Sequence, residues 1–175
     1  AEEQIGQSMS IFTLLSDTDQ LALSAHTLHG ILVYGGKFAE SVRLFDEPGA
    51  IYQELDLPAK PAKPTIVSAF ALMHLGRYSQ AAERFQQTLK FYPKRSRGYA
   101  IKNLGRIDMA QGNLEAAQQN LLDALSLFRA ADDVNGLGQT LGCLGITELR
   151  LGNLTHAQDY IDENRLLAAN TLIIL

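Results

Sequence analysis

The sequence predicts an all-α protein built of stacked helical hairpins, and three observations support this fold class. Glycines recur at nearly constant spacing, because Gly36, Gly76, Gly112 and Gly152 are 40, 36 and 40 residues apart. Each glycine follows an apolar run and precedes a segment that contains alanine. The composition, 46% hydrophobic and 19% charged over 175 residues, is that of a folded chain rather than a disordered one. A period of this length indicates a linear array of supersecondary units.

The third unit illustrates how the sequence specifies a hairpin. Ile101, Leu104 and Ile107 have helical spacing and give one helix an apolar face. Gly112 is expected to end this helix in the left-handed conformation, which costs glycine little. Asn113 then offers a side chain that can cap the next helix.

The elements follow in chain order. We expect a leader helix and cap in residues 1–19, a degenerate first repeat in 20–56, a connector in 57–64, three repeats in 65–169 and an apolar tail in 170–175. The expected helices run near 18–34, 37–46, 64–75, 77–92, 95–111, 113–130, 134–151 and 153–169. The connector contains Pro58, Pro61 and Pro64, which are incompatible with a regular helix. Both ends of the chain favour a domain taken from a longer protein.

The units resemble the tetratricopeptide repeat, abbreviated TPR. The third unit matches its motif at Ile101, Leu104, Gly105, Gly112, Leu114, Ala117, Leu121 and Ala124, and the fourth matches at Leu141, Leu144, Gly145, Gly152, Leu154, Ala157 and Ile161. The second unit matches at Tyr78, Ala81 and Phe85. The spacing also resembles a 40-residue variant found in bacterial regulators and signalling scaffolds. The resemblance implies a right-handed superhelix, or α-solenoid, of about four antiparallel hairpins, in which Gly105 and Ala117 lie where two helices cross closely.

The same resemblance implies a binding groove lined by the first helix of each hairpin. Carried over to this chain, the candidate peptide-binding residues are Phe70, Met73, His74, Tyr99, Lys102, Arg106, Met109, Ile146 and Arg150. Lys102 and Arg106 are one helical turn apart, so both are expected to be solvent-accessible and to reach one acidic ligand. The alternative interpretation is that several of these side chains pack against the next helix.

The charge distribution supports an acidic partner. Residues 61–107 carry a net charge of +8, whereas residues 1–60 and 108–175 each carry −6. A basic segment of this kind is typical either of a solvated face or of a surface that attracts an acidic ligand. The acidic flanks and few aromatic residues make nucleic acid a poor partner for this chain.

Motifs for catalysis, for cofactors and for metal binding are missing from the sequence. The phosphate loop, the dinucleotide glycine fingerprint and the nucleophile elbow do not occur. His26 and His29 could share a metal ion but lack a third ligand. Cys143, the single cysteine, lies in an apolar run and is expected to be an inert buried thiol. No apolar run is long enough for a membrane span. We therefore expect no enzyme activity, no cofactor, no metal site and a cytoplasmic location.

The sequence as a whole favours a non-catalytic domain that binds another protein or peptide in its groove, as part of a larger regulator or scaffold. The alternative is the effector-sensing domain of a transcriptional regulator, with a small acidic ligand in the same groove. An enclosed pocket would favour the sensor, and an open trough would favour the polypeptide binder.

Overall fold

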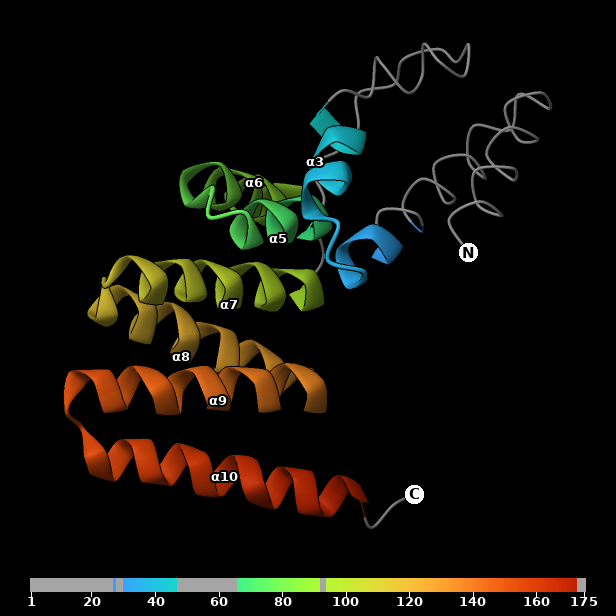
Figure 1. The fold of residues 1–175 in the computed structure, drawn as a ribbon. Helices are drawn as coiled ribbons and strands as arrows, with labels where there is room; N and C mark the ends of the chain where they lie inside the picture. Colours follow the sequence, from blue (N-terminus) through green and yellow to red (C-terminus); the bar gives the residue numbers. More distant parts are fainter. Residues whose placement is uncertain (1–26, 28–29, 47–65, 92–93, 173–175) are drawn as a thin grey trace, which may run out of the picture. The chain divides into compact units, whose positions relative to one another are not determined.

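The chain folds into α-helices throughout the part described by the computed structural model, which covers residues 27, 30–46, 66–91 and 94–172 (Figure 1). The helices are α3 (Phe38–Asp46), α5 (Ile66–His74), α6 (Tyr78–Phe91), α7 (Lys94–Gln111), α8 (Leu114–Ala130), α9 (Val134–Leu151) and α10 (Leu154–Leu172). Their bounds fall close to the predicted ones, except that α10 extends into the predicted tail. The leader segment 1–19 and the connector 57–64 lie outside the described residues. The all-α hairpin prediction is confirmed.

The chain divides into two compact units, Ala1–Arg84 and Phe85–Leu175. In the first unit α3 packs against α5, and Ala69, Ala71 and Leu72 are fully buried. The ring of His74 stacks on Phe38 at 4.6 Å between centroids and meets Phe70 at 4.3 Å. This aromatic cluster joins the end of α5 to the start of α3.

The turns inside the hairpins share one backbone geometry. Gly36, Gly76, Gly112 and Gly152 all have positive φ, between 72° and 85°. After each glycine, the next backbone N–H donates to a carbonyl five residues earlier, as from Asn113 to Asp108 and from Asn153 to Glu148, both at 2.9 Å. This is the bond of a Schellman cap, and it satisfies a carbonyl that the helix end leaves unpaired. The repeated glycine is therefore a helix stop, as predicted.

The two predicted caps have different outcomes. Asn113 precedes α8, but its side chain makes no capping hydrogen bond, so the prediction that it caps this helix is wrong. The backbone bond to Asp108 already fixes Asn113 in the turn. Asp133 does cap α9, because its carboxylate accepts a hydrogen bond from the backbone N–H of Gly136 at 3.0 Å. The second cap also places a carboxylate where α9 begins.

The second unit contains two hairpins, α7 with α8 and α9 with α10, and α8 packs against both α7 and α9. Its core includes the buried side chains of Leu121, Leu125, Leu141 and Leu144. Ala117 is fully buried at the crossing of α7 and α8. A Cβ on Gly105 would lie 2.9 Å from Leu121 and 3.2 Å from the Ala117 carbonyl oxygen. The predicted close crossing is confirmed.

A second close approach surrounds the ring of Phe128, which is 1% exposed. A Cβ on Gly98 of α7 would lie 2.8 Å from this ring, and a Cβ on Gly136 of α9 would lie closer still. Tyr99 meets the same ring edge-on, with centroids 4.8 Å apart. Phe128 of α8 therefore fills a slot between α7 and α9, and the slot requires glycine on both sides.

Candidate functional site

The predicted site residues fall into both units. Phe70, Met73 and His74 lie on α5 of the first unit, and the other six lie on α7 and α9 of the second. Met73 is 7% exposed and belongs to the core of its unit, so it does not present a groove surface. His74 is exposed but stacked on Phe38. The second unit thus contains the surface that the contacts define most fully.

Three contacts align α7 with α9. The Tyr99 hydroxyl donates to Asp133 at 3.1 Å, the Lys102 ammonium donates to the side-chain carbonyl of Gln139, and Arg150 donates to the backbone carbonyl of Met109 at 2.7 Å. The partners advance together along both helices, so α7 and α9 run parallel. We call this surface, formed by Tyr99, Lys102, Arg106, Met109, Asp133, Gln139, Cys143, Ile146 and Arg150, the α7–α9 seam.

Lys102 is buried in the seam, with 3% of its surface exposed, so the prediction that it is solvent-accessible is wrong. Its ammonium lies 4.8 Å from the centroid of the Tyr99 ring and is bound by Gln139. These contacts explain the burial, because an aromatic face and a carbonyl oxygen both attract a cation. Burial lowers the pKa of Lys102 to about 8, and the neighbouring Arg106 cation contributes to this lowering, while Cys143 and Asp133 act in the opposite direction.

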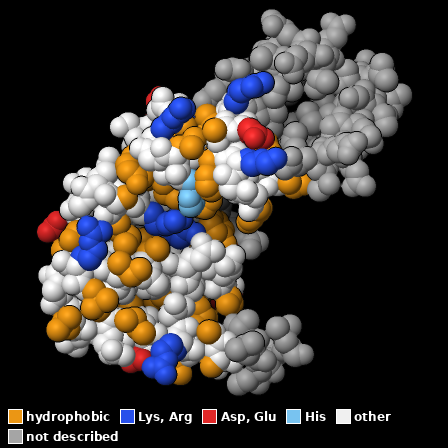
Figure 2. All heavy atoms as spheres, viewed as in Figure 1, with side chains coloured by type: hydrophobic (Ala, Val, Ile, Leu, Met, Phe, Trp, Pro, Cys, Tyr) orange, Lys and Arg blue, Asp and Glu red, His pale blue; other side chains and the backbone are white. Residues whose placement is uncertain are grey.

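The other basic residues of the seam are more exposed. Arg106 is half-buried, and its guanidinium donates to the side chain of Asn103 at 3.1 Å. Arg150 is exposed and binds the Met109 carbonyl in the last turn of α7, where a cation also complements the helix dipole. Ile146 is 53% exposed. Basic side chains lie among apolar ones in the middle of the space-filling view, over the region of α7 (Figure 2).

The seam carries no catalytic arrangement among the described residues. Burial raises the pKa of the Cys143 thiol, although the Arg106 and Lys102 cations act in the opposite direction. This favours the unreactive thiol form. The described residues contain no cluster of three or more histidine, cysteine, aspartate or glutamate side chains that could hold a metal ion. The seam can therefore bind through charge, hydrogen bonds and apolar contact.

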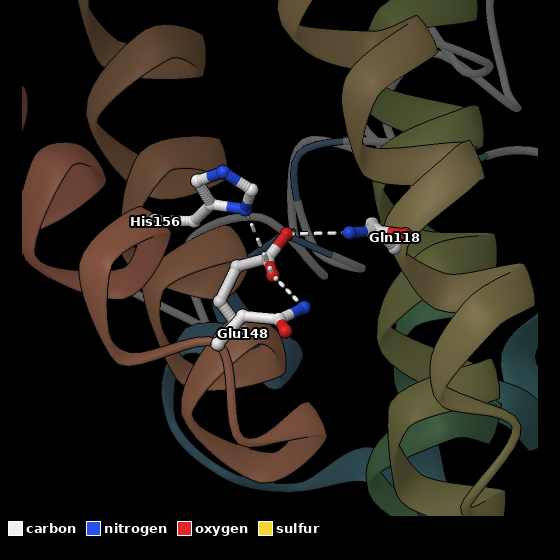
Figure 3. Close-up of polar contacts among 4 residues, drawn as sticks. Gln118, Glu148 and His156 are labelled. Atoms are coloured by element: carbon white, nitrogen blue, oxygen red, sulfur yellow. Dashed lines mark hydrogen bonds and ion pairs between the residues drawn. The ribbon is translucent and has the colours of Figure 1, made fainter.

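Sequence reasoning missed a second polar cluster, which surrounds Glu148 on α9 (Figure 3). Glu148 is 1% exposed, and its carboxylate accepts hydrogen bonds from Gln118 at 2.6 Å and from Asn153 at 2.8 Å. His156 approaches the same carboxylate at 3.9 Å. The cluster links α8, α9, the turn after α9 and α10. One sequence signal could have found it, since Glu148 is an acid four residues after Leu144 on the apolar face of a predicted helix.

The parallel first helices, the antiparallel second helices and the glycine caps define a helical-repeat protein of the TPR-like class. Solved structures agree. The nearly identical TPR-like repeats assigned to a kinesin light chain of Podosopora anserina superpose with a TM-score of 0.67 at 21% identity, covering 98% of this chain and 86% of that one. BtubC of P. vanneervenii gives a TM-score of 0.53 at 16% identity, covering 97% and 90%. The chain therefore has the TPR-like fold.

The apo form of RapI is also similar, with a TM-score of 0.57 at 18% identity. The match covers 97% of this chain but only 56% of RapI, so this chain spans just over half of that protein. No family model matches the chain, and no curated protein does. None of the described helices combines the length and the apolar character that crossing a lipid bilayer requires.

Proposed function

We propose that this chain is a non-catalytic interaction domain whose α7–α9 seam binds a polypeptide segment with acidic side chains. The observation that carries the proposal is the combination of Lys102, Arg106 and Arg150 with an exposed Ile146 along two parallel helices. The carboxylate in this seam, Asp133, is 5% exposed and already accepts hydrogen bonds from Tyr99 and Gly136. The surface is therefore biased toward an anionic ligand.

Arg106 has the main electrostatic role in this proposal. A guanidinium carries five N–H donors, so Arg106 can bind Asn103 and a ligand carboxylate together. Lys102, being buried, contributes its charge from below the surface rather than direct contact. Ile146 supplies apolar contact that an extended segment or a helix of the partner can cover. We propose a regulator or scaffold in the cytoplasm as the larger setting of this domain.

Selection from a random displayed-peptide library tests the proposal. The wild-type chain should enrich peptides that contain aspartate and glutamate, and Arg106→Glu should lose this enrichment. For one synthesised peptide from the wild-type selection, Arg106→Glu should weaken binding at least tenfold, about 1.4 kcal/mol, in fluorescence anisotropy. Binding should also weaken with rising salt, since the interaction is between partly exposed charges.

Arg97→Glu is the matched control, because it makes the same charge change on an exposed residue of the same helix. At 3.6 residues per turn, Arg97 lies roughly 140° around α7 from Lys102 and points away from the seam. Less than a twofold effect from this variant supports a defined site. Equal losses from both variants would indicate diffuse attraction, and a wild-type selection without acidic enrichment would contradict the proposal.

A further inference from the structure

The outward face of α10 is uncovered, whereas the equivalent face of α8 is not. Both are second helices of hairpins, and α8 packs against α7 on one side and α9 on the other. Leu121 and Ala124 of α8 are fully buried. Among the described helices α10 packs against α9, and its Ile161 and Leu166 are 39% and 66% exposed. A face with the same position in the repeat therefore lacks the cover that α9 gives to α8.

The residues of this face are arranged around a charged centre. At 100° per residue, Gln158, Asp162 and Arg165 share the middle of the face, with Ile161 on one flank and Leu166 on the other. Asp162 accepts hydrogen bonds from Gln158 at 2.9 Å and from Arg165 at 3.3 Å. Ala157, on the opposite side of the helix, is buried toward α9. The outward face, which we call the α10 face, thus contains both signs of charge and two apolar flanks.

The order of these residues is self-complementary under a two-fold axis. Consider a second α10 that packs antiparallel, with the axis passing between Glu163 and Asn164. Asp162 then lies opposite the partner's Arg165, and Ile161 lies opposite the partner's Leu166. The angular positions agree as well, because an antiparallel two-fold places one flank of a helix against the other flank of its copy. Each copy repeats both contacts, as an isologous interface requires.

We propose that the α10 face binds a second copy of this chain in an antiparallel, two-fold arrangement. Opposite charges face each other at the centre, and an apolar pair closes each side, so neither copy presents an unmatched charge. Association covers Ile161 and Leu166, which raises the effective burial of the last hairpin. Since one helix per copy makes a small interface, the dimer is weak and reversible. This inference is independent of the α7–α9 seam.

Sedimentation equilibrium of the whole chain, under a reducing agent that keeps Cys143 a thiol, tests this inference. Because a one-helix interface is small, the concentration series extends to about 1 mM. The wild type should show a reversible monomer–dimer equilibrium. Asp162→Arg and Arg165→Asp should each weaken the dimer at least tenfold, since each creates two pairs of like charges per dimer. Leu166→Glu should have a similar effect.

Mixing the two single charge variants gives the sharpest result. Asp162→Arg paired with Arg165→Asp restores an opposite pair at both contacts of a mixed dimer, so the equimolar mixture should dimerise as well as the wild type. Asp123→Arg, on the exposed surface of α8, is the control and should leave association unchanged. Far-ultraviolet circular dichroism and melting curves should confirm that every variant folds. A monomeric wild type, a mixture that stays monomeric, or a dimer insensitive to all three α10 variants would overturn the proposal.

Discussion

Two buried charged side chains in the second unit differ in how the protein accommodates them. Glu148 of α9 accepts hydrogen bonds from two amide side chains, and these donors belong to two other segments of the unit. Lys102 of α7 has one carbonyl oxygen and one aromatic ring as partners, and a second cation, Arg106, lies nearby. Both side chains are at most 3% exposed. Equal burial therefore hides a large difference in compensation.

The difference indicates what each group does. A buried carboxylate with two amide donors retains much of the hydrogen bonding that water would supply, so Glu148 can hold α8, α9 and α10 together. A buried ammonium next to another cation is poorly compensated, which its lowered pKa reflects. We infer that Glu148 stabilises the fold, whereas Lys102 destabilises it and is useful for the charge that it brings to the seam.

The largest expected effect is on Glu148. Glu148→Ala should lower the free energy of unfolding by about 2 to 4 kcal/mol, because it removes the shared acceptor of Gln118 and Asn153 and leaves a cavity. Urea denaturation measures this change. Glu163→Ala is the control, since Glu163 pairs with Arg129 at 2.6 Å on the surface and should cost at most about 1 kcal/mol. Similar losses at the two positions would show that Glu148 has no special structural role.

The opposite sign is expected for Lys102. Lys102→Met keeps much of the length of the side chain but removes the buried charge, so it should raise the free energy of unfolding by about 1 to 2 kcal/mol at pH 7. Its partner Gln139 is exposed and also donates to Asn135, so the substitution leaves no buried orphan. A loss of stability in the same urea assay would mean that the contacts with Tyr99 and Gln139 compensate the charge fully.

The pH dependence of this gain gives a separate test. The pKa of Lys102 is lowered from 10.5 to about 8 in the folded chain, so the unfolded chain binds the proton more tightly between these values. The unfavourable contribution is complete below pH 8 and disappears as the pH approaches 10.5, so wild-type stability should rise relative to Lys102→Met. Each pKa unit corresponds to about 1.4 kcal/mol. A gain that is constant from about pH 7 to 10 would contradict the lowered pKa.

The smallest effect is expected at His156. Its imidazole is 3.9 Å from Glu148 but its side chain is 67% exposed, so His156→Ala should change stability by less than about 0.5 kcal/mol. Thermal melting near neutral pH is sufficient to measure it. A loss as large as that of Glu148→Ala would make the histidine, rather than the two amides, the main partner of the buried carboxylate.

The sequence predicted most of the fold and part of the site. Helices and glycine caps followed from local rules, since the apolar period and the positive φ of Gly112 and Gly152 depend on nearby residues alone. The resemblance to the repeat brought Tyr99, Lys102, Arg106 and Arg150 to α7 and α9. The burial of Lys102 was not predictable in the same way, because it depends on Tyr99, Gln139 and the spacing of two helices. Nor could the sequence place Gln118 beside Glu148, thirty residues away.

The ring of Phe128 has an evolutionary consequence. It occupies the slot formed by Gly98 and Gly136, so neither glycine can acquire a side chain while the ring remains. A smaller residue at position 128 would open space for alanine on both sides, but as a first step it would leave a cavity. The three positions should therefore change together or not at all in related chains. Sequence divergence in this repeat is thus limited by a coupled triplet rather than by three independent sites.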